Sequence, residues 1–216
     1  CLLTGRNHHR VGMGMLPDYV RLVRTGLIVP NQEMGTLVDF GALLLLDARR
    51  GVGQHMMQTA TALAIERARC QGAAVVGVRD CGHIGRVGHY AEQCAAAGMT
   101  GIYFVNVADH APYQAPFACS SARLGTNPFA IAMPGRAGPA VVLDMATSAI
   151  AFGKARVARN KGAPVPEGSV IDVVGRPTTD PTALVDEHRG ALMSFGLHKG
   201  SGLAVLCELL GAALTG

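Results

Sequence analysis

The sequence predicts an α/β protein, because short apolar segments that suit buried strands alternate with segments of helical periodicity. Hydrophobic residues make up 49% of the 216 residues and charged residues 16%, so the chain can bury a sizeable core and disorder is not expected. The 28 glycines indicate many tight turns and close backbone approaches. A chain of this length suits one large domain or two small ones.

The clearest helix is predicted over residues 54–69, where apolar residues recur on one side and Gly72 follows as a stop. Residues 161–186 are rich in proline and are predicted to form a long ordered loop. The other predicted elements, in chain order, are a helix over 16–25, strands over 41–47 and 73–78, a helix over 90–97, strands over 102–107 and 141–143, and helices over 149–158 and 202–214.

Charge, cysteines and hydropathy limit the expected partners. The net charge is only +4 and Lys and Arg are scattered, so we expect no nucleic-acid partner, whereas a small anionic ligand suits this balance. The six cysteines form no Cys-x-x-Cys pair, which favours reduced thiols and a cytoplasmic location over disulfides or zinc. No apolar run reaches the roughly 18 residues of a membrane span, so no membrane partner is expected.

The two ends of the sequence predict that it is part of a longer chain. It opens with Cys1, no signal segment follows, and it stops just after an apolar helix.

The common nucleotide-binding and hydrolase signatures are absent from the sequence. Residues 12–14 (GMG) and 51–53 (GVG) lack the third glycine of the Rossmann fingerprint, and neither follows a convincing strand. Gly153 precedes a lysine but lacks the upstream glycine of a phosphate-binding P-loop. No Gly-x-Ser-x-Gly elbow of a serine hydrolase occurs.

Five short segments, each rich in glycine or polar residues, occur in a characteristic order: 83–93 (HIGRVGHYAEQ), 124–128 (LGTNP), 144–148 (DMATS), 177–181 (PTTDP) and 198–200 (HKG). On these motifs, essentially the whole chain resembles the malate/L-lactate dehydrogenase family, which includes ureidoglycolate and sulfolactate dehydrogenases. The Ile-Gly-Arg that follows His83 is most similar to the hydroxycarboxylate dehydrogenase B type.

The resemblance implies an NAD- or NADP-dependent oxidoreductase that forms a homodimer and acts on a small anionic carboxylate. It also implies a fold distinct from the Rossmann fold. We expect a layered sheet-and-helix nucleotide-binding domain over residues 36–199. A helical domain, only partly present, is expected from residues 1–35 together with 200–216.

The residues around His83 suit acid–base chemistry. Reduction of a 2-oxo acid needs a hydride at the carbonyl carbon and a proton at its oxygen, and histidine can hold a proton near neutral pH. Gly82 and Gly85 allow the backbone to approach a ligand closely. Without the resemblance, a turn histidine bonded to the backbone would be the simpler interpretation. The family's histidine at this place is its proton donor and acceptor, so we expect His83 to be catalytic.

His9 is the second catalytic candidate. The family carries Ser-His-Gly in this region, whereas aligning His9 with the family histidine puts His8 in place of the serine and Arg10 in place of the glycine. This departure leaves the role of His9 open, and it makes Arg10 one candidate for holding a substrate carboxylate. The nearby histidines do not have the spacing of a metal site, so no metal is expected.

The resemblance assigns three segments to the cofactor, and their residue types agree with that role. A guanidinium at a helix start favours phosphate or carboxylate, a carboxylate can bind ribose hydroxyls, and a basic pair can bind phosphate. A surface arginine, a capping Thr-Ser pair and a solvated loop are the simpler interpretations. The predicted cofactor-binding residues are Gly85, Arg86, Val87, Val142, Leu143, Asp144, Met145, Ala146, Thr147, Ser148, His198, Lys199 and Gly200.

Arg86 and Asn127 are the predicted substrate-binding residues, although Asn127 equally suits fixing the turn before Pro128, which we favour. The predicted reaction transfers a hydride between a nicotinamide cofactor and a 2-oxo/2-hydroxy carboxylate such as malate, lactate or 2-hydroxyglutarate. Two alternatives stay open: reduction of a cyclic imine by the same hydride chemistry, and a non-catalytic nucleotide-binding paralogue.

Overall fold

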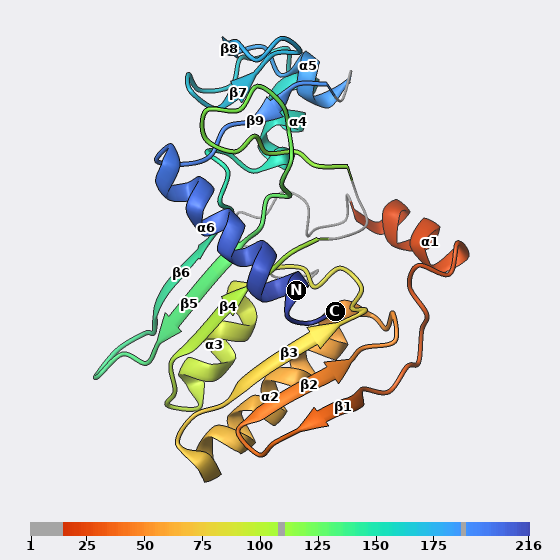
Figure 1. Cartoon of the computed structure of the whole chain (residues 1–216), viewed down its shortest axis with the longest axis vertical. Coiled ribbons are helices and arrows are strands. Elements are labelled where there is room, and N and C mark those ends of the chain that lie inside the picture. The colour runs from red at the N-terminus through yellow and green to blue at the C-terminus, as the bar shows by residue number, and fades with distance from the viewer. Residues whose placement is uncertain (1–14, 108–110, 187–188) are drawn as a thin grey trace. The chain divides into compact units, whose positions relative to one another are not determined.

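The computed structural model of the chain describes residues 15–107, 111–186 and 189–216. Helices and strands alternate through this part of the chain, which confirms a mixed α/β fold (Figure 1). The chain divides into two compact units. Unit 1 comprises Cys1–Tyr103, Ala130–Asp144 and Leu214–Gly216, and unit 2 comprises Phe104–Phe129 and Met145–Ala213.

Unit 1 contains a three-stranded sheet formed by β1 (Gly35–Asp39), β2 (Leu43–Asp47) and β3 (Val75–Arg79), in that order. β1 runs antiparallel to β2, with an irregularity between Thr36 and Val38, and β2 runs parallel to β3. The two parallel strands are joined by a helix, as parallel strands require.

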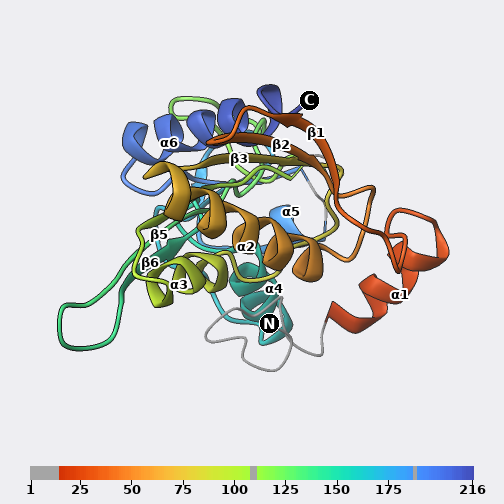
Figure 2. The ribbon, with the colours of Figure 1, turned by 90° about the horizontal axis from the view of Figure 1, so that it is seen from below.

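Helix α2 (Gly53–Gln71) covers one face of this sheet (Figure 2). Leu44 and Leu46 point to that face and pack against Ala60, because alternate residues of a strand lie on the same side. Gly72 ends the helix in the left-handed conformation, at φ 84°, which glycine adopts without steric cost.

A second sheet contains β4 (Gly101–Phe104), β5 (Phe129–Met133) and β6 (Val141–Met145) in that order. Within unit 1, Tyr103 of β4 joins this sheet to the helices. Its hydroxyl lies 3.0 Å from Thr61 Oγ1 of α2 and donates to the Tyr90 carbonyl of α3 (Gly88–Ala96) at 3.3 Å. Burial raises the pKa of the Tyr103 phenol, so it stays protonated in this contact.

The core of unit 2 lies around α4 (Phe152–Asn160) and α5 (Thr182–Val185). Three two-residue strands, β7 (Val170–Ile171), β8 (Pro177–Thr178) and β9 (Ala191–Leu192), pair antiparallel in the order β8-β7-β9. Helix α6 (His198–Glu208) continues into a π-helical turn over Leu209–Ala213. The buried core side chains are Phe152, Ala155, Val165, Val170, Leu184 and Leu192.

Several sequence predictions need correction. Residues 161–186 are not a loop without regular structure, because β7, β8 and α5 lie within them. The strand expected over 102–107 ends at Phe104, and β6 is exposed rather than buried. β1, β5 and β9 were not predicted.

The predicted helices agree in position with α1 (Leu16–Arg24), α2, α3 and α4, whereas α6 begins at His198 rather than at residue 202 and α5 was not predicted. The grouping of residues 1–35 with 200–216 in one helical domain stays a prediction. Within the two compact units, α1 belongs to unit 1 and α6 to unit 2. Among the described residues, no helix combines the length and the apolar character that a membrane crossing requires.

Candidate active site

His83 lies in the loop between β3 and α3, and its side chain is half-buried. The hydroxyl of Tyr19, on α1, lies 2.8 Å from His83 Nδ1. The two rings are tilted at 58° with their centroids 5.9 Å apart. Gln54, in the first turn of α2, donates from Nε2 to the Tyr19 hydroxyl at 2.5 Å. Tyr19 of α1 therefore contacts the imidazole directly, and Gln54 of α2 is linked to it through the Tyr19 hydroxyl.

The local sequence explains why the segment that carries Tyr19 forms a helix. Pro17 occupies the first turn, where a missing N–H costs nothing, and Asp18 complements the positive end of the helix dipole. Arg21 and Arg24 complement the negative end. Burial raises the pKa of the Tyr19 phenol, with a smaller opposing effect of the Gln54 hydrogen bond, so Tyr19 remains a neutral hydroxyl at physiological pH.

The backbone before His83 is held by two glycines of the turn that begins α2. Gly82 N donates to the Gly51 carbonyl at 3.2 Å. A side chain at Gly53 would overlap the carbonyl oxygens of both Gly82 and His83. After the histidine, the Tyr90 hydroxyl donates to the Ile84 carbonyl at 2.5 Å. The loop that carries His83 is therefore fixed on both sides.

Arg86 lies between two carboxylates of unit 1. Its Nη1 donates to Glu92 Oε1 at 3.1 Å and lies 3.7 Å from Asp144 Oδ2, and its Nη2 pairs with Glu92 Oε2. Only 11% of the Arg86 side chain is exposed. These ion pairs explain a cation near the α3 N-terminus without any ligand. They also weaken the prediction that Arg86 binds a substrate carboxylate, because a ligand would have to displace them.

Asp144 packs against the first turn of α3, where its charge is favourable. A side chain at Gly88 would overlap the Asp144 carboxylate, so only glycine permits this approach. A carboxylate near a helix N-terminus is stabilised by the helix dipole. The neighbouring Val142 and Leu143 are 38% and 47% exposed. This part of the predicted cofactor segment is therefore accessible.

Thr147 and Ser148, in unit 2, are instead buried. Thr147 Oγ1 donates to the Thr126 carbonyl at 3.0 Å, and Ser148 Oγ donates to the Ile150 carbonyl at 2.8 Å. Both hydroxyls thus serve internal hydrogen bonds. This favours the structural interpretation of the Thr-Ser pair over phosphate contacts through their side chains.

The start of α6 carries the predicted basic pair. His198 and Lys199 are exposed, and Leu197 before them has φ 58° and ψ −117°, which is strained for a residue other than glycine. The N–H groups of Lys199 and Gly200 already donate to Gly196 and Phe195. An anion at this helix start would therefore be held by the two side chains more than by these backbone groups.

A pocket of about 340 Å³ lies beside this helix start within unit 2. Leu197 and Phe117 line it, and the ring of Phe117 stands edge-on to that of His198 with centroids 5.9 Å apart. The Phe117 N–H donates to Ser201 Oγ at 3.0 Å, which ties the pocket wall to α6.

Asn127 is fully buried in unit 2. Its Nδ2 donates to the Ala204 carbonyl at 2.9 Å and to Glu208 Oε2 at 2.7 Å. The residue has φ 31°, which suits a fixed turn. The structure thus favours the turn role of Asn127 over the predicted substrate contact.

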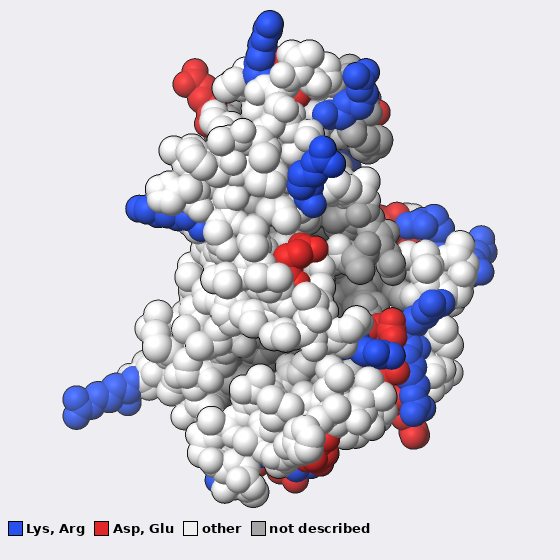
Figure 3. Space-filling model, viewed as in Figure 1, with Lys and Arg blue, Asp and Glu red and all other residues white. Residues whose placement is uncertain are grey.

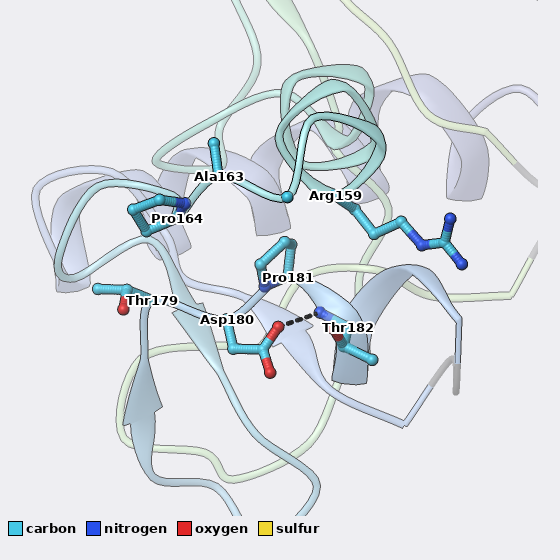
Figure 4. Close-up of a pocket in the computed structure, with 8 residues that line it drawn as sticks. Arg159, Ala163, Pro164, Thr179, Asp180, Pro181 and Thr182 are labelled. Carbon is cyan, nitrogen blue, oxygen red and sulfur yellow. Dashed lines mark hydrogen bonds between the residues drawn. The ribbon is translucent and has the colours of Figure 1, made fainter.

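Another pocket of unit 2, of about 360 Å³, contains none of the predicted site residues (Figure 4). Asp180 there accepts a hydrogen bond from the Thr182 N–H at 2.9 Å, and the Arg159 guanidinium points away and pairs with Asp186. Both contacts join side chains to other parts of unit 2 and so stabilise its local structure. The pocket is lined by Arg159, Gly162, Ala163, Pro164, Thr179, Asp180, Pro181 and Thr182.

Three partners of candidate site residues could not be predicted from the sequence: Tyr19, Gln54 and Glu92. Tyr19 lies within the helix predicted over 16–25, and no local pattern links it to a histidine 64 residues away. His9 and Arg10 lie outside the described residues.

On the face seen in Figure 3, Lys and Arg side chains occur at separate places with acidic residues among them.

Comparison with known proteins identifies the class. The family model described as malate/L-lactate dehydrogenase matches residues 3–216, and the chain belongs to this family of dehydrogenases. It is 47% identical over 214 residues to hydroxycarboxylate dehydrogenase B of Escherichia coli K12, an alignment that covers 99% of this chain and 58% of that protein.

Two solved structures are similar to the fold. One is described as a malate/lactate dehydrogenase from E. coli, with a TM-score of 0.89 and 45% identity over 99% of this chain and 59% of that one. The other is Δ1-piperideine-2-carboxylate reductase from Pseudomonas syringae pv. tomato, with a TM-score of 0.87 and 33% identity over 94% and 60%. The chain thus spans less than two thirds of the length of these relatives.

Proposed function

We propose that the protein is an NAD(P)-dependent oxidoreductase that transfers a hydride between a nicotinamide cofactor and a small 2-oxo/2-hydroxy carboxylate, such as malate, lactate or 2-hydroxyglutarate. One observation carries the proposal: in a chain of the malate/L-lactate dehydrogenase family, His83 is half-buried and held by Tyr19 in a fixed loop. A positioned histidine of this kind is suited to general acid–base catalysis.

In this mechanism, His83 holds the proton that the substrate oxygen needs. A nicotinamide cofactor, when bound, supplies the hydride for reduction or accepts it in oxidation. His83 gives its ring proton to the 2-oxo oxygen during reduction and takes a proton from the 2-hydroxyl during oxidation. The anchored loop keeps the imidazole in place, so little ordering is needed when substrate arrives.

The residues of each unit fit a nucleotide. In unit 2, the exposed cations His198 and Lys199 can hold phosphate beside the pocket lined by Leu197 and Phe117. In unit 1, Asp144 can accept ribose hydroxyls next to the exposed Val142 and Leu143. The further cofactor contacts proposed from the family resemblance are Gly85, Arg86, Val87, Met145, Ala146, Thr147, Ser148 and Gly200.

The finer architecture and assembly belong to the same proposal. Residues 36–199 would form a non-Rossmann cofactor-binding domain, and residues 1–35 with 200–216 would belong to a helical domain. His9 would assist catalysis, with Arg10 or Arg86 near the substrate carboxylate. The family resemblance supports a cytoplasmic homodimer.

Reduction of a cyclic imine is a second candidate, because the chain is 33% identical to the piperideine-carboxylate reductase structure. The proton and hydride requirements are the same, with a nitrogen in place of the carbonyl oxygen.

Turnover assays distinguish these functions. The protein is incubated with NADH or NADPH and a panel of 2-oxo acids and cyclic-imine carboxylates, and nicotinamide absorbance is followed. We expect oxidation with at least one 2-oxo acid, and the preferred nucleotide identifies the cofactor. Oxidation only with imines would support the second candidate. Nucleotide binding by calorimetry without turnover on any substrate would contradict both and indicate a non-catalytic paralogue.

A further inference from the structure

The pocket beside the start of α6 has the composition of a site for a flat, uncharged ring. Its volume is about 340 Å³, near the lower end of the range for ligand pockets. Its large apolar lining side chains, among the described residues, are Phe117, Ile171, Met193 and Leu197. Phe117 and Leu197 are 51% and 54% exposed, so a large part of each is accessible to a ligand. An aromatic ring next to aliphatic side chains suits the stacking of a planar group.

The walls of this pocket are fixed within unit 2. The Phe117 N–H donates to Ser201 Oγ of α6 at 3.0 Å, which holds one wall. On another side, the backbone of Gly175 approaches Ser120 so closely that a side chain at position 175 would overlap it. The walls therefore need little ordering when a ring enters, which lowers the entropic cost of binding.

The charge beside the pocket is positive. His198 and Lys199 directly follow the lining residue Leu197, and both are exposed. The His198 ring contacts the Phe117 ring edge-on, so this part of α6 lies at the pocket. Of the described residues that line the pocket, none is acidic. These groups favour a ligand that carries an anion next to its ring.

We propose that this pocket binds the adenine ring of the dinucleotide, with the phosphates held by His198 and Lys199. The inference rests on the proposed function and assigns one half of the cofactor to a place in unit 2. Adenine is planar and uncharged, and a ribose links it to negatively charged phosphates. Both parts of this half therefore meet groups of matching chemistry.

Two properties of the pocket argue against the nicotinamide ring as its occupant. The oxidised nicotinamide ring carries a positive charge, which Lys199 would repel. The reacting ring must also lie beside a group that exchanges a proton with the substrate. Of the described lining residues, none is a histidine or a carboxylate, and the one titratable side chain is the Cys119 thiol. The ring that takes no part in the chemistry is therefore the better occupant.

Alkylation of Cys119 tests the occupancy of the pocket without requiring turnover. Cys119 lines the pocket and is exposed, and Cys70, near the end of α2, is exposed and provides the control. The protein is treated with iodoacetamide, and mass spectrometry follows the labelling of each cysteine. Saturating ADP, or the better-binding of NADH and NADPH, should slow labelling of Cys119 by roughly fivefold or more and leave Cys70 unchanged. Nicotinamide mononucleotide should slow neither.

A matched pair of substitutions separates loss of the pocket from general damage. Phe117→Ala removes the ring that stacks on adenine but keeps the N–H that bonds to Ser201. It should raise the Kd for ADP and for the dinucleotide by roughly 5–30-fold in calorimetry, as is typical when a stacking aromatic ring is removed. Phe40→Ala removes an exposed ring of unit 1 and should leave both Kd values within about twofold.

Binding of ADP or of the dinucleotide without slower labelling of Cys119 would overturn the inference, and so would equal protection by nicotinamide mononucleotide. Its failure is distinguishable from failure of the proposed function. Turnover of a 2-oxo acid with Cys119 unprotected would leave the function and remove adenine from this pocket. Protection of Cys119 by ADP and the dinucleotide, without turnover on any substrate, would leave the pocket and remove the oxidoreductase. Absence of binding by every nucleotide would overturn both.

Discussion

Gly53, the first residue of α2, lies so close to the Gly82 carbonyl that a methyl group there would overlap the oxygen. The atoms that a Cβ at residue 53 would meet are the backbone carbonyl oxygens of Gly82 and His83, and a backbone carbonyl cannot rotate away as a flexible side chain can. We predict that Gly53→Ala destabilises the protein by ~1–3 kcal/mol. Because the loop must move, turnover should fall as well. Thermal unfolding and kcat measured on the same preparation check both effects.

Gly202 provides the control for this substitution. It lies within α6, is exposed, and has open space where a Cβ would be built. Gly202→Ala should stabilise the protein by ~0.5–1 kcal/mol, because alanine loses less backbone entropy in a helix. Equal unfolding temperatures for Gly53→Ala and Gly202→Ala would show that the close approach of Gly53 to the Gly82 and His83 carbonyls does not limit the side chain at position 53.

Replacing the imidazole of His83 should affect chemistry more than folding. We predict that His83→Asn lowers turnover by roughly 10²–10⁴-fold, the usual loss when a general acid–base group is removed. The half-buried position leaves room for asparagine, so the unfolding temperature and the nucleotide Kd should change little. Steady-state kinetics with the best 2-oxo acid from the substrate panel measures the loss. Turnover close to wild type would exclude an acid–base role.

Lys199 should contribute to affinity for the nucleotide. We predict that Lys199→Met raises the Kd for NADH or NADPH by roughly 5–30-fold, equivalent to ~1–2 kcal/mol for a partly solvated phosphate contact. The loss should shrink as salt concentration rises, because the charge is exposed. Lys161→Met, an exposed lysine just after α4, is the control. Calorimetry that gives both variants the same Kd would argue against phosphate binding at α6.

Asp172 should make stability depend on acid pH. Its Oδ1 accepts from the N–H groups of Arg176 and Val174, each at 2.9 Å, and these bonds lower the pKa of the carboxyl. A carboxyl with a lowered folded-state pKa stabilises the fold above its unfolded pKa of about 3.9, and this stabilisation is lost as pH falls through the folded value. Asp172→Asn should therefore unfold at a lower temperature than wild type at neutral pH, and the two curves should converge in strong acid.

An exposed carboxylate of the same unit gives the comparison for Asp172. Glu167→Gln should leave the unfolding temperature nearly unchanged at both pH values. A difference between Asp172→Asn and wild type that grows toward acid would contradict the assigned sign.

The helices longer than α5 were predictable because their signals are local. α2 combines apolar periodicity with a terminal glycine, and both can be read from consecutive residues. β1 was missed because its residues do not alternate cleanly between buried and exposed, and its pairing with β2 includes an irregularity. β7 and β8 are two residues each, too short to leave a periodic pattern, and they exist through pairing with each other and, for β7, with β9.

The site divides in the same way. Motif and residue chemistry predicted His83 as a catalytic candidate, but its contact with Tyr19 spans 64 residues and depends on tertiary structure. The Arg86 position near a helix start suggested an anionic ligand, whereas the structure provides Glu92 and Asp144 as internal anions. Asn127 could not be classified until its burial and its bond to Glu208 were known.

The path of the chain has a consequence for dissecting the molecule. The polypeptide passes between the two units four times, after Tyr103, Phe129, Asp144 and Ala213. Neither unit is one uninterrupted stretch, so no truncation at a single position can release either of them whole. Producing unit 2 by itself would require a new peptide link from Phe129 to Met145 in place of the excised residues. Deletion of a long terminal segment would therefore remove parts of both units at once, and point substitutions are the better way to assign roles to individual residues.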